Sequence, residues 1–167
     1  MVLRAAARVQ KETGAAINVH PPGYPEAPKE IVSYIESHGG NPYRTVISHI
    51  DRTIFDESTL MDLAKTGCII EYDFFGIEST YFPPRPIDLP NDGMRLKYIR
   101  ALVERGHLDQ IFISHDICAK TRLKAYGGHG YGHIPRNVVP LMKARGFSDD
   151  EVDTILTKNP RRILSIS

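Results

Sequence analysis

The fold is decided by Ala15-Ala16-Ile17-Asn18-Val19-His20, by Thr45-Val46-Ile47-Ser48-His49 and by Ile111-Phe112-Ile113-Ser114-His115-Asp116. In each stretch, an apolar run typical of a β-strand ends in a side chain that can bind a metal ion. Buried parallel strands read as continuous apolar runs. In barrels of alternating strands and helices, catalytic groups lie at the C-terminal ends of those strands. The pattern therefore predicts a parallel sheet with a candidate hydrolytic metal site along one edge.

Strand and helix patterns alternate along the rest of the chain. Strands are expected over 15–20, 45–49, 68–73 and 111–116. Helices are expected over 2–13, 26–38, 56–65, from 91 or 92 to 106, 135–145 and 148–157, with a short helical turn after Pro160. Four strands that are each followed by a helix indicate a parallel α/β architecture.

The sequence is compatible with two architectures for such a sheet. One is a self-sufficient, doubly wound open sheet, and the other is part of an eight-stranded barrel. A complete barrel of this type typically needs ~250 residues, and this chain has 167. We expect a single domain over 1–167, and half a barrel would leave two strand edges unpaired.

Composition excludes several classes of partner. Lys and Arg number 21 and Asp and Glu 20, which gives a net charge of +1 and no basic excess for nucleic acid. Two cysteines make no disulfide framework, so a reduced, cytoplasmic compartment is expected. No apolar run is long enough for a bilayer, so no membrane partner is expected either. A small-molecule substrate is the expected partner.

His20 and His49 each end an apolar run, and one strand–helix repeat separates them. Adjacent parallel strands would bring both imidazoles to the same edge, where neutral nitrogens can bind a metal. Asp116 could add a carboxylate ligand that also accepts a proton. The alternatives are that the histidines only cap strand ends and that Asp116 caps a helix. Asp51 and Arg52 follow His49 and could orient it, although a surface ion pair between them is the favoured interpretation.

The segments 74–90 and 117–133 are expected to be long loops that shape a pocket. The candidates to line it are Tyr72, Arg122, Tyr126 and His129. Arg122 could pair with an anionic group such as a carboxylate or sulfonate. His129 and His133 have the spacing of a helical zinc chelate, but the glycines around them favour a loop. His115 should point away from the site because side chains alternate along a strand.

Several segments resemble the second half of the phosphotriesterase family of the amidohydrolase superfamily, and its phosphotriesterase-related branch in particular. The segments that carry the resemblance are Ile17–His20, Val46–Thr53, Glu71–Gly76, Ile113–Cys118, Lys120–Tyr131 and Asn159-Pro160. They occur in the order of that family and cover nearly the whole chain.

The resemblance implies a distorted (β/α)8 TIM barrel that holds two divalent metals, with zinc expected. It implies that His20 is the ligand at the end of strand five, His49 the ligand at the end of strand six, and Asp116 the carboxylate at the end of strand eight. A metal-activated hydroxide in such enzymes attacks an ester, lactone, phosphotriester or amide centre, and the carboxylate takes up the proton.

One feature of the family is missing. A His-x-His pair should end strand one, and a carbamylated lysine or a glutamate should bridge the metals from strand four, but no early His-x-His occurs here. The chain is therefore expected to be the C-terminal half of the barrel, strands five to eight, lacking the N-terminal half. The unpaired edges favour aggregation or a homodimer.

Three functions are open at this point. The first is a metal-dependent hydrolase of the phosphotriesterase-related type. The second is a catalytically inactive, truncated remnant with at most weak metal binding, so whether this chain is itself an enzyme stays open. The third is a small doubly wound binding domain, ranked last because no Gly-x-Gly-x-x-Gly follows a first strand.

Overall fold

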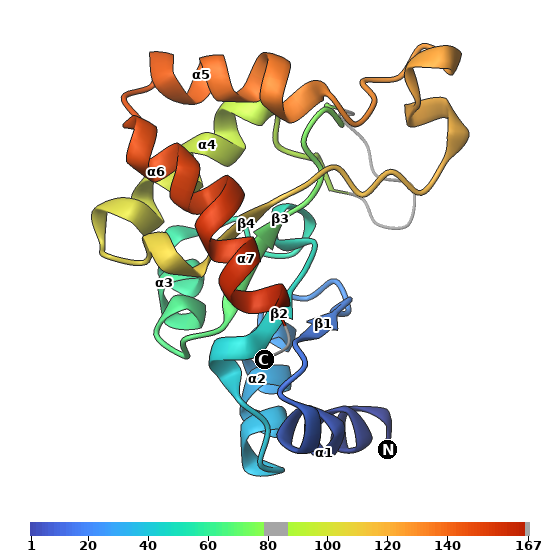
Figure 1. Cartoon of the computed structure of the whole chain (residues 1–167), viewed down its shortest axis with the longest axis vertical. Coiled ribbons are helices and arrows are strands. Elements are labelled where there is room, and N and C mark those ends of the chain that lie inside the picture. Colours follow the sequence, from blue (N-terminus) through green and yellow to red (C-terminus); the bar gives the residue numbers. More distant parts are fainter. Residues whose placement is uncertain (79–86, 166–167) are drawn as a thin grey trace.

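The computed structural model describes residues 1–78 and 87–165 and contains one parallel sheet (Figure 1). The strands are β1 (Ile17–Val19), β2 (Thr45–Ile47), β3 (Ile69–Tyr72) and β4 (Ile111–Ile113). They lie side by side in the order β1-β2-β3-β4, and each pairs in parallel with the next. A doubly wound sheet needs a reversal of strand order, whereas consecutive neighbours are the arrangement of a barrel. The sheet order therefore favours the half-barrel.

Helices follow each strand, close to where the sequence predicts them. Their bounds are α1 Val2–Thr13, α2 Ala27–Ser37, α3 Glu57–Ala64, α4 Asp92–Glu104, α5 Val139–Ala144, α6 Asp149–Asp153 and α7 Asn159–Leu164. Side chains cap several of them: the Asp56 carboxylate accepts the Thr59 N–H and begins α3, and Asn91 accepts the Met94 N–H and begins α4. Gly14 ends α1 in the left-handed conformation that glycine adopts without strain.

The C-terminal helices differ from the prediction in one respect. The expected separate helix over 148–157 and turn after Pro160 are one continuous helical run, in which a π-helical turn at Thr154–Lys158 joins α6 to α7. Pro160 lies directly after this π-helical turn, inside the continuous run. A second π-turn, at Ile134–Val138, precedes α5.

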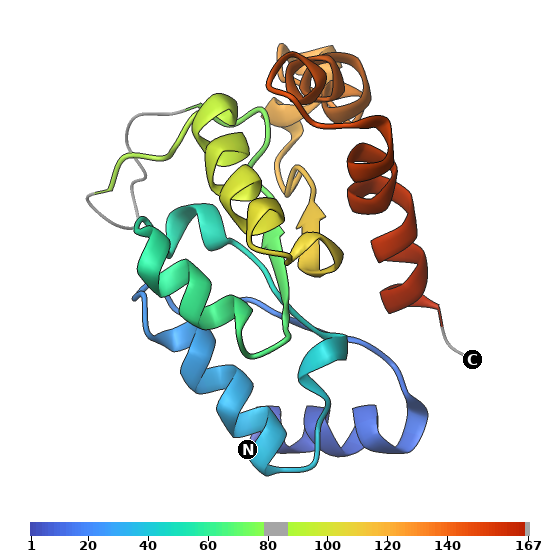
Figure 2. The same ribbon diagram turned by 90° about the vertical axis from the view of Figure 1, so that its left-hand side faces the viewer.

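Helices cover one face of the sheet and α7 lies on the other side of it (Figure 2). Ile47, Ile70 and Ile111 belong to the large core formed with α2, α3 and α4, in which Leu60, Leu63, Leu96 and Ile99 are also buried. The side chains on this face are apolar along the strands because helices cover the face and exclude water from it.

The opposite face changes from apolar to polar along the strands. Near the N-terminal ends, Val46, Ile69 and Phe112 form a small cluster that Ile163 of α7 covers. The Arg44 guanidinium fixes α7 there, because it donates to the carbonyls of Ile163 (2.8 Å) and Ser165 (2.8 Å). One step further along the strands the side chains become polar, and that end of the sheet holds the candidate site. Among the described residues, no helix combines the length and apolarity that a membrane span needs.

Candidate metal centre

A pocket of about 400 Å³ lies at the C-terminal ends of the strands, where barrels of this type place their chemistry. Every strand contributes to its lining. The lining residues are Asn18, His20, Ser48, His49, Glu71, Asp73, Ser114 and Asp116. The three predicted metal ligands are therefore all at one pocket, as the strand-end pattern predicts.

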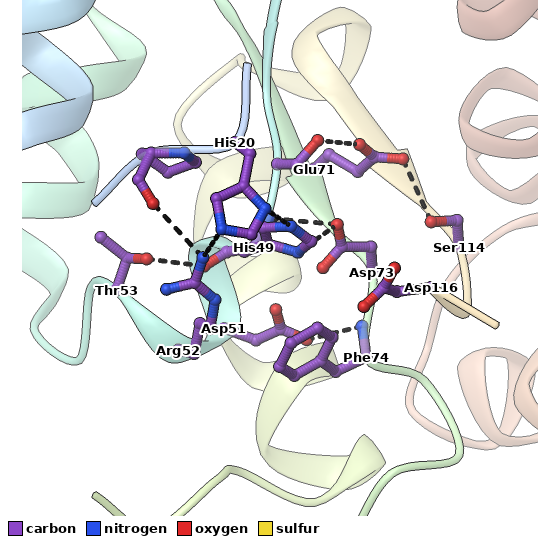
Figure 3. A network of polar contacts seen from close by, with 12 residues as sticks. His20, His49, Asp51, Arg52, Thr53, Glu71, Asp73, Phe74, Ser114 and Asp116 are labelled. Atoms are coloured by element: carbon purple, nitrogen blue, oxygen red, sulfur yellow. Dashed lines mark hydrogen bonds and ion pairs between the residues drawn. The ribbon is translucent and has the colours of Figure 1, made fainter. Parts of the chain in front are cut away.

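His20 and His49 lie in direct contact (Figure 3). The Nδ1 atom of His20 is 2.7 Å from the Nε2 atom of His49, and the two rings cross at 77° with centroids 4.3 Å apart. Two imidazole nitrogens from adjacent strand ends thus converge on one point. Imidazole nitrogens in this arrangement are suited to a divalent transition metal.

The backbone is strained at two of the predicted ligands. His49 has φ 56° and Asp116 has φ 42°, and they are the non-glycine residues with positive φ in the described part of the chain. Such conformations are uncommon for residues with a Cβ, and they concentrate at functional sites. The reversal at His49 matters because Ile47, two positions earlier, faces the helix-covered core. The turn directs the His49 ring into the pocket with Ser48 instead.

Asp73 holds the His49 ring from the far side. Its Oδ2 atom is 2.8 Å from His49 Nδ1 and also accepts the His49 backbone N–H at 3.1 Å. A carboxylate on the outer nitrogen of a histidine fixes the ring and its tautomer, as it does around many metal ligands. Asp73 was not among the site residues that the sequence pattern predicts. The signal available was its place at the end of the third strand, level with His20 and His49.

Asp51 and Arg52 are not the surface ion pair that the sequence favoured. Asp51 is 1% exposed and Arg52 6% exposed. The Asp51 carboxylate accepts from Arg95 Nε at 2.9 Å and from the Phe74 N–H at 2.9 Å. Arg52 turns the other way and donates to His20 Nε2 at 2.9 Å. Arg52 therefore contacts His20, and Asp51 holds the backbone at Phe74, whereas the alternative that the sequence left second had both residues orient His49.

The electrostatics of the histidine pair are asymmetric. Burial lowers the pKa of His20, and the neighbouring His49 and Arg52 lower it further. Burial also opposes the charged form of His49, but the hydrogen bond and charge of Asp73 outweigh it and raise the pKa of His49. Burial raises the pKa of Asp73. The pKa of His20 is therefore lowered, whereas Asp73 favours a proton on the facing Nδ1 atom of His49.

Asp116 lines the pocket and is held by Arg122. The Nη1 atom of Arg122 is 3.4 Å from the Asp116 Oδ2 atom and also donates to the Asp116 carbonyl. In the described residues, no three His, Cys, Asp or Glu side chains converge closely enough to hold a metal. The donor set thus fits a metal through the His20–His49 pair, with Asp116 beside it at the same pocket.

Below these residues, a polar layer joins the strands. The Glu71 carboxylate accepts the Ser48 hydroxyl at 2.7 Å and the Ser114 hydroxyl at 3.1 Å, and Ser48 Oγ also lies 2.5 Å from Asn18 Oδ1. Asn18 and Glu71 belong to β1 and β3, and Ser48 and Ser114 directly follow β2 and β4. The layer separates the histidines from the apolar cluster under Ile163, and sequence reasoning did not single it out.

The predicted substrate-lining residues lie apart from the pocket or at its margin. Tyr72 is 1% exposed and packs in the helix-covered core. Tyr126 is 60% exposed, and His129 stacks on His115 with ring centroids 5.7 Å apart. The Arg122 side chain contacts the pocket residue Asp116. Residues 79–86 of the predicted loop over 74–90 lie outside the described residues.

A second histidine group forms behind the strand ends. His115 points away from the pocket, as its place in the strand predicts, and lies beside His129 and His133. The Nε2 atom of His133 is 2.6 Å from Asp92 Oδ2, and His115 Nε2 accepts the Ile134 N–H at 3.2 Å. Burial, with help from the other two histidines, lowers the pKa of His115 to about 4. These contacts join the 117–133 segment to the start of α4.

The fold and the pocket define half of a TIM barrel with histidines at adjacent strand ends. The chain belongs to the phosphotriesterase family, whose model matches residues 1–164. Membership confirms the family resemblance read from the strand ends.

Relatives of known name are similar along almost the whole chain. The N-acetyltaurine hydrolase of Dictyostelium discoideum is 44% identical over 165 residues, and that of Salmo salar is 47% identical over 165 residues. These matches cover 98% of this chain, but 45% and 47% of the relatives. A phosphotriesterase-related protein of Nematostella vectensis is 44% identical over 164 residues. The chain thus spans about half the length of the curated relatives it matches.

Solved structures agree with the architecture. A resiniferatoxin-binding protein from Rhodobacter sphaeroides superposes with a TM-score of 0.91 at 29% identity, covering 99% of this chain and 47% of that one. The phosphotriesterase homology protein from Escherichia coli, solved with phosphate in its active site, gives 0.84 at 26% identity and covers 98% and 53%. The predicted fold class, α/β and half of a TIM barrel, is confirmed.

Proposed function

We propose that this chain forms the His–His side of the active site of a metal-dependent hydrolase, with an amide of the N-acetyltaurine type as substrate. The convergence of His20 Nδ1 and His49 Nε2 at 2.7 Å carries the proposal. The choice of substrate comes from the relatives named N-acetyltaurine hydrolase, which are 44–47% identical to this chain. Esters and lactones are the related substrate classes that the same chemistry covers.

The metal ligands in this proposal are His20, His49 and Asp116. Zinc suits a set of imidazoles and a carboxylate. When bound, such a metal supplies Lewis acidity and makes hydroxide available at neutral pH by lowering the pKa of water. The protein's own groups do the rest: Asp73 orients His49, and Arg122 holds Asp116 where its carboxylate can accept a proton.

The substrate proposal has a chemical basis in the pocket margin. A sulfonate is an anion that planar guanidinium groups bind through paired hydrogen bonds. Arg122 lies at the margin with its guanidinium partly exposed, 24% for the side chain, and it already contacts Asp116. We assign it the anionic end of the substrate, which places the amide towards the histidine pair.

Metal content and hydrolysis test the proposal together. The purified 167-residue chain, His20→Ala, His49→Ala and the control His38→Ala would be dialysed against zinc and analysed by mass spectrometry, then assayed with N-acetyltaurine. His38 is the matched control because its ring stacks on Tyr34 at the end of α2, away from the pocket. We expect about one zinc in the wild type and the control, and its loss in the other two. A wild type without zinc would overturn the metal site.

An inactive remnant is the second candidate. It is favoured by the observation that no third ligand converges on the histidine pair within the described residues. It predicts zinc binding that is weak and hydrolysis no faster than in His49→Ala. Taurine release above that of His49→Ala would exclude it.

A further inference from the structure

Arg52 makes an unusual contact with a predicted metal ligand. It lies in the short helical turn Ile50–Arg52 after β2, 6% exposed, and donates from Nη2 to His20 Nε2 at 2.9 Å and to the Pro21 carbonyl at 3.3 Å. A guanidinium group has donors and no acceptor. The His20 Nε2 atom must therefore be the acceptor, with its lone pair towards Arg52.

This contact assigns the protons of both rings. A neutral His20 whose Nε2 accepts must carry its proton on Nδ1, and that N–H can donate only to the His49 Nε2 atom at 2.7 Å. The His49 proton is then on Nδ1, which faces Asp73 Oδ2 at 2.8 Å. The hydrogen bonds run in one direction, from Arg52 through His20 and His49 to Asp73.

The two histidines consequently differ in whether the nitrogen that faces the metal position has a free lone pair. His49 presents a lone pair on Nε2 and has a carboxylate for its outer N–H, which is the usual arrangement of a ligating histidine. His20 presents a proton towards the same point. Ligation through Nδ1 would move that proton to Nε2, where it would meet the Arg52 donor, and ligation through Nε2 is blocked by the same donor.

We propose that Arg52 is a positioning residue that sets the metal affinity of this site. Its hydrogen bond to Nε2 holds His20 in the tautomer with the proton on Nδ1, and this tautomer cannot bind a metal until Arg52 moves away from the ring. The inference rests on the proposed function, because it concerns the same metal centre. It adds a role for a residue outside the ligand set: a metal ion and the Arg52 contact compete for His20.

Substitutions of Arg52 separate the hydrogen-bond effect from the charge effect. Arg52→Gln supplies an amide oxygen that can accept a proton on Nε2. Arg52→Met removes the charge without supplying an acceptor, and Arg52→Lys keeps both the charge and a donor. The first measurement needs no metal: long-range ¹H–¹⁵N correlation spectra of the metal-free chain show which ring nitrogen of His20 is protonated. We expect Nδ1 in the wild type and Arg52→Lys, and Nε2 in Arg52→Gln.

The second measurement is zinc affinity by competition with a chromogenic chelator. Loss or gain of an outer-nitrogen partner changes metal affinity roughly 10–100-fold, so we expect Arg52→Gln to bind zinc about ten-fold or more tightly than the wild type. Arg52→Met should gain less than Arg52→Gln, and Arg52→Lys should gain nothing. An Nε2 proton on wild-type His20, or equal gains in Arg52→Met and Arg52→Gln, would overturn the inference. If the role of Arg52 fails in this way, loss of zinc binding in His49→Ala would still support the metal site. Failure of the Arg52 inference is therefore distinguishable from failure of the proposed function.

Discussion

At the scale of single residues, carboxylates fix the histidines of this protein. Asp73 faces His49 and Asp92 faces His133, each at less than 3 Å. The first pair lies at the candidate metal centre and the second supports the segment behind it. At the candidate metal centre, the ring of a predicted ligand is thus held by a carboxylate outside the predicted ligand set.

Asp73→Asn tests this dependence. The amide keeps the size of the side chain but loses the charge that favours a proton on His49 Nδ1. We expect zinc affinity to fall roughly 10–100-fold, as is typical when such a partner is lost. Isothermal titration measures it, and Asp62→Asn, on the exposed surface of α3 where it pairs with Lys65, is the control. Equal affinities in the two variants would contradict the role of Asp73.

His115 makes folding stability depend on pH. Its pKa is about 4 in the folded chain and 6.5 in its ordinary state, because it is desolvated beside His129 and His133. Between these values the unfolded chain binds more protons, so stability falls as the pH falls from about 6.5 to about 4. In His115→Gln, which does not titrate, the free energy of unfolding in urea should decline less across this window. If the free energies of unfolding of the two proteins change in parallel with pH, His115 is not the source of this pH dependence.

At the scale of elements, α7 has an unexpected place. It lies on the side of the sheet opposite α2, α3 and α4 (Figure 2), and its Ile163 covers the apolar end of the face that the pocket also occupies. Arg44 holds the end of the helix there through backbone carbonyls. Helix α7 thus stabilises the sheet that supports the site.

Two neighbouring residues on α7 isolate this contribution. Ile163 is 1% exposed and Leu164 is 62% exposed. Ile163→Ala should lower the free energy of unfolding by about 2–5 kcal/mol through lost burial and a cavity, whereas Leu164→Ala should change it by less than about 0.5 kcal/mol. Urea denaturation followed by circular dichroism compares them. Similar losses in both variants would mean that α7 does not cover the sheet in solution.

At the scale of the whole molecule, the sheet ends in two outer strands. In the described residues β1 and β4 each pair with one neighbour, and the polar face between them carries the pocket. Outer strands present backbone groups that can pair with another chain. We propose that two copies associate through these edges, which keeps the sequence-based expectation of a homodimer.

A lysine at the β1 edge tests this association. Asn18 is exposed on β1, where its side chain also lines the pocket beside Ser48, and a charge on an outer strand opposes edge-to-edge pairing. Light scattering across a concentration series should show a mass that rises towards a dimer in the wild type and stays lower in Asn18→Lys. Ser37→Lys adds the same charge at the exposed end of α2 and should behave as the wild type. A wild type that remains monomeric at every concentration would refute the proposal.

The sequence by itself determined the class of fold and the edge that holds the site. Apolar runs and helical spacing are local signals, so they predict four parallel strands and their helices, and they place His20, His49 and Asp116 at one pocket. The single 1–167 domain stays a prediction.

Only the tertiary structure decided how those residues are supported. Arg52 and Asp73 contact the histidines across long stretches of chain, and Ile163 reaches β2, β3 and β4 from the C-terminal helix. The left-handed backbone at His49, with φ 56°, is likewise seen only in the structure. Contacts between distant segments depend on how the elements pack, and local patterns carry no record of that packing.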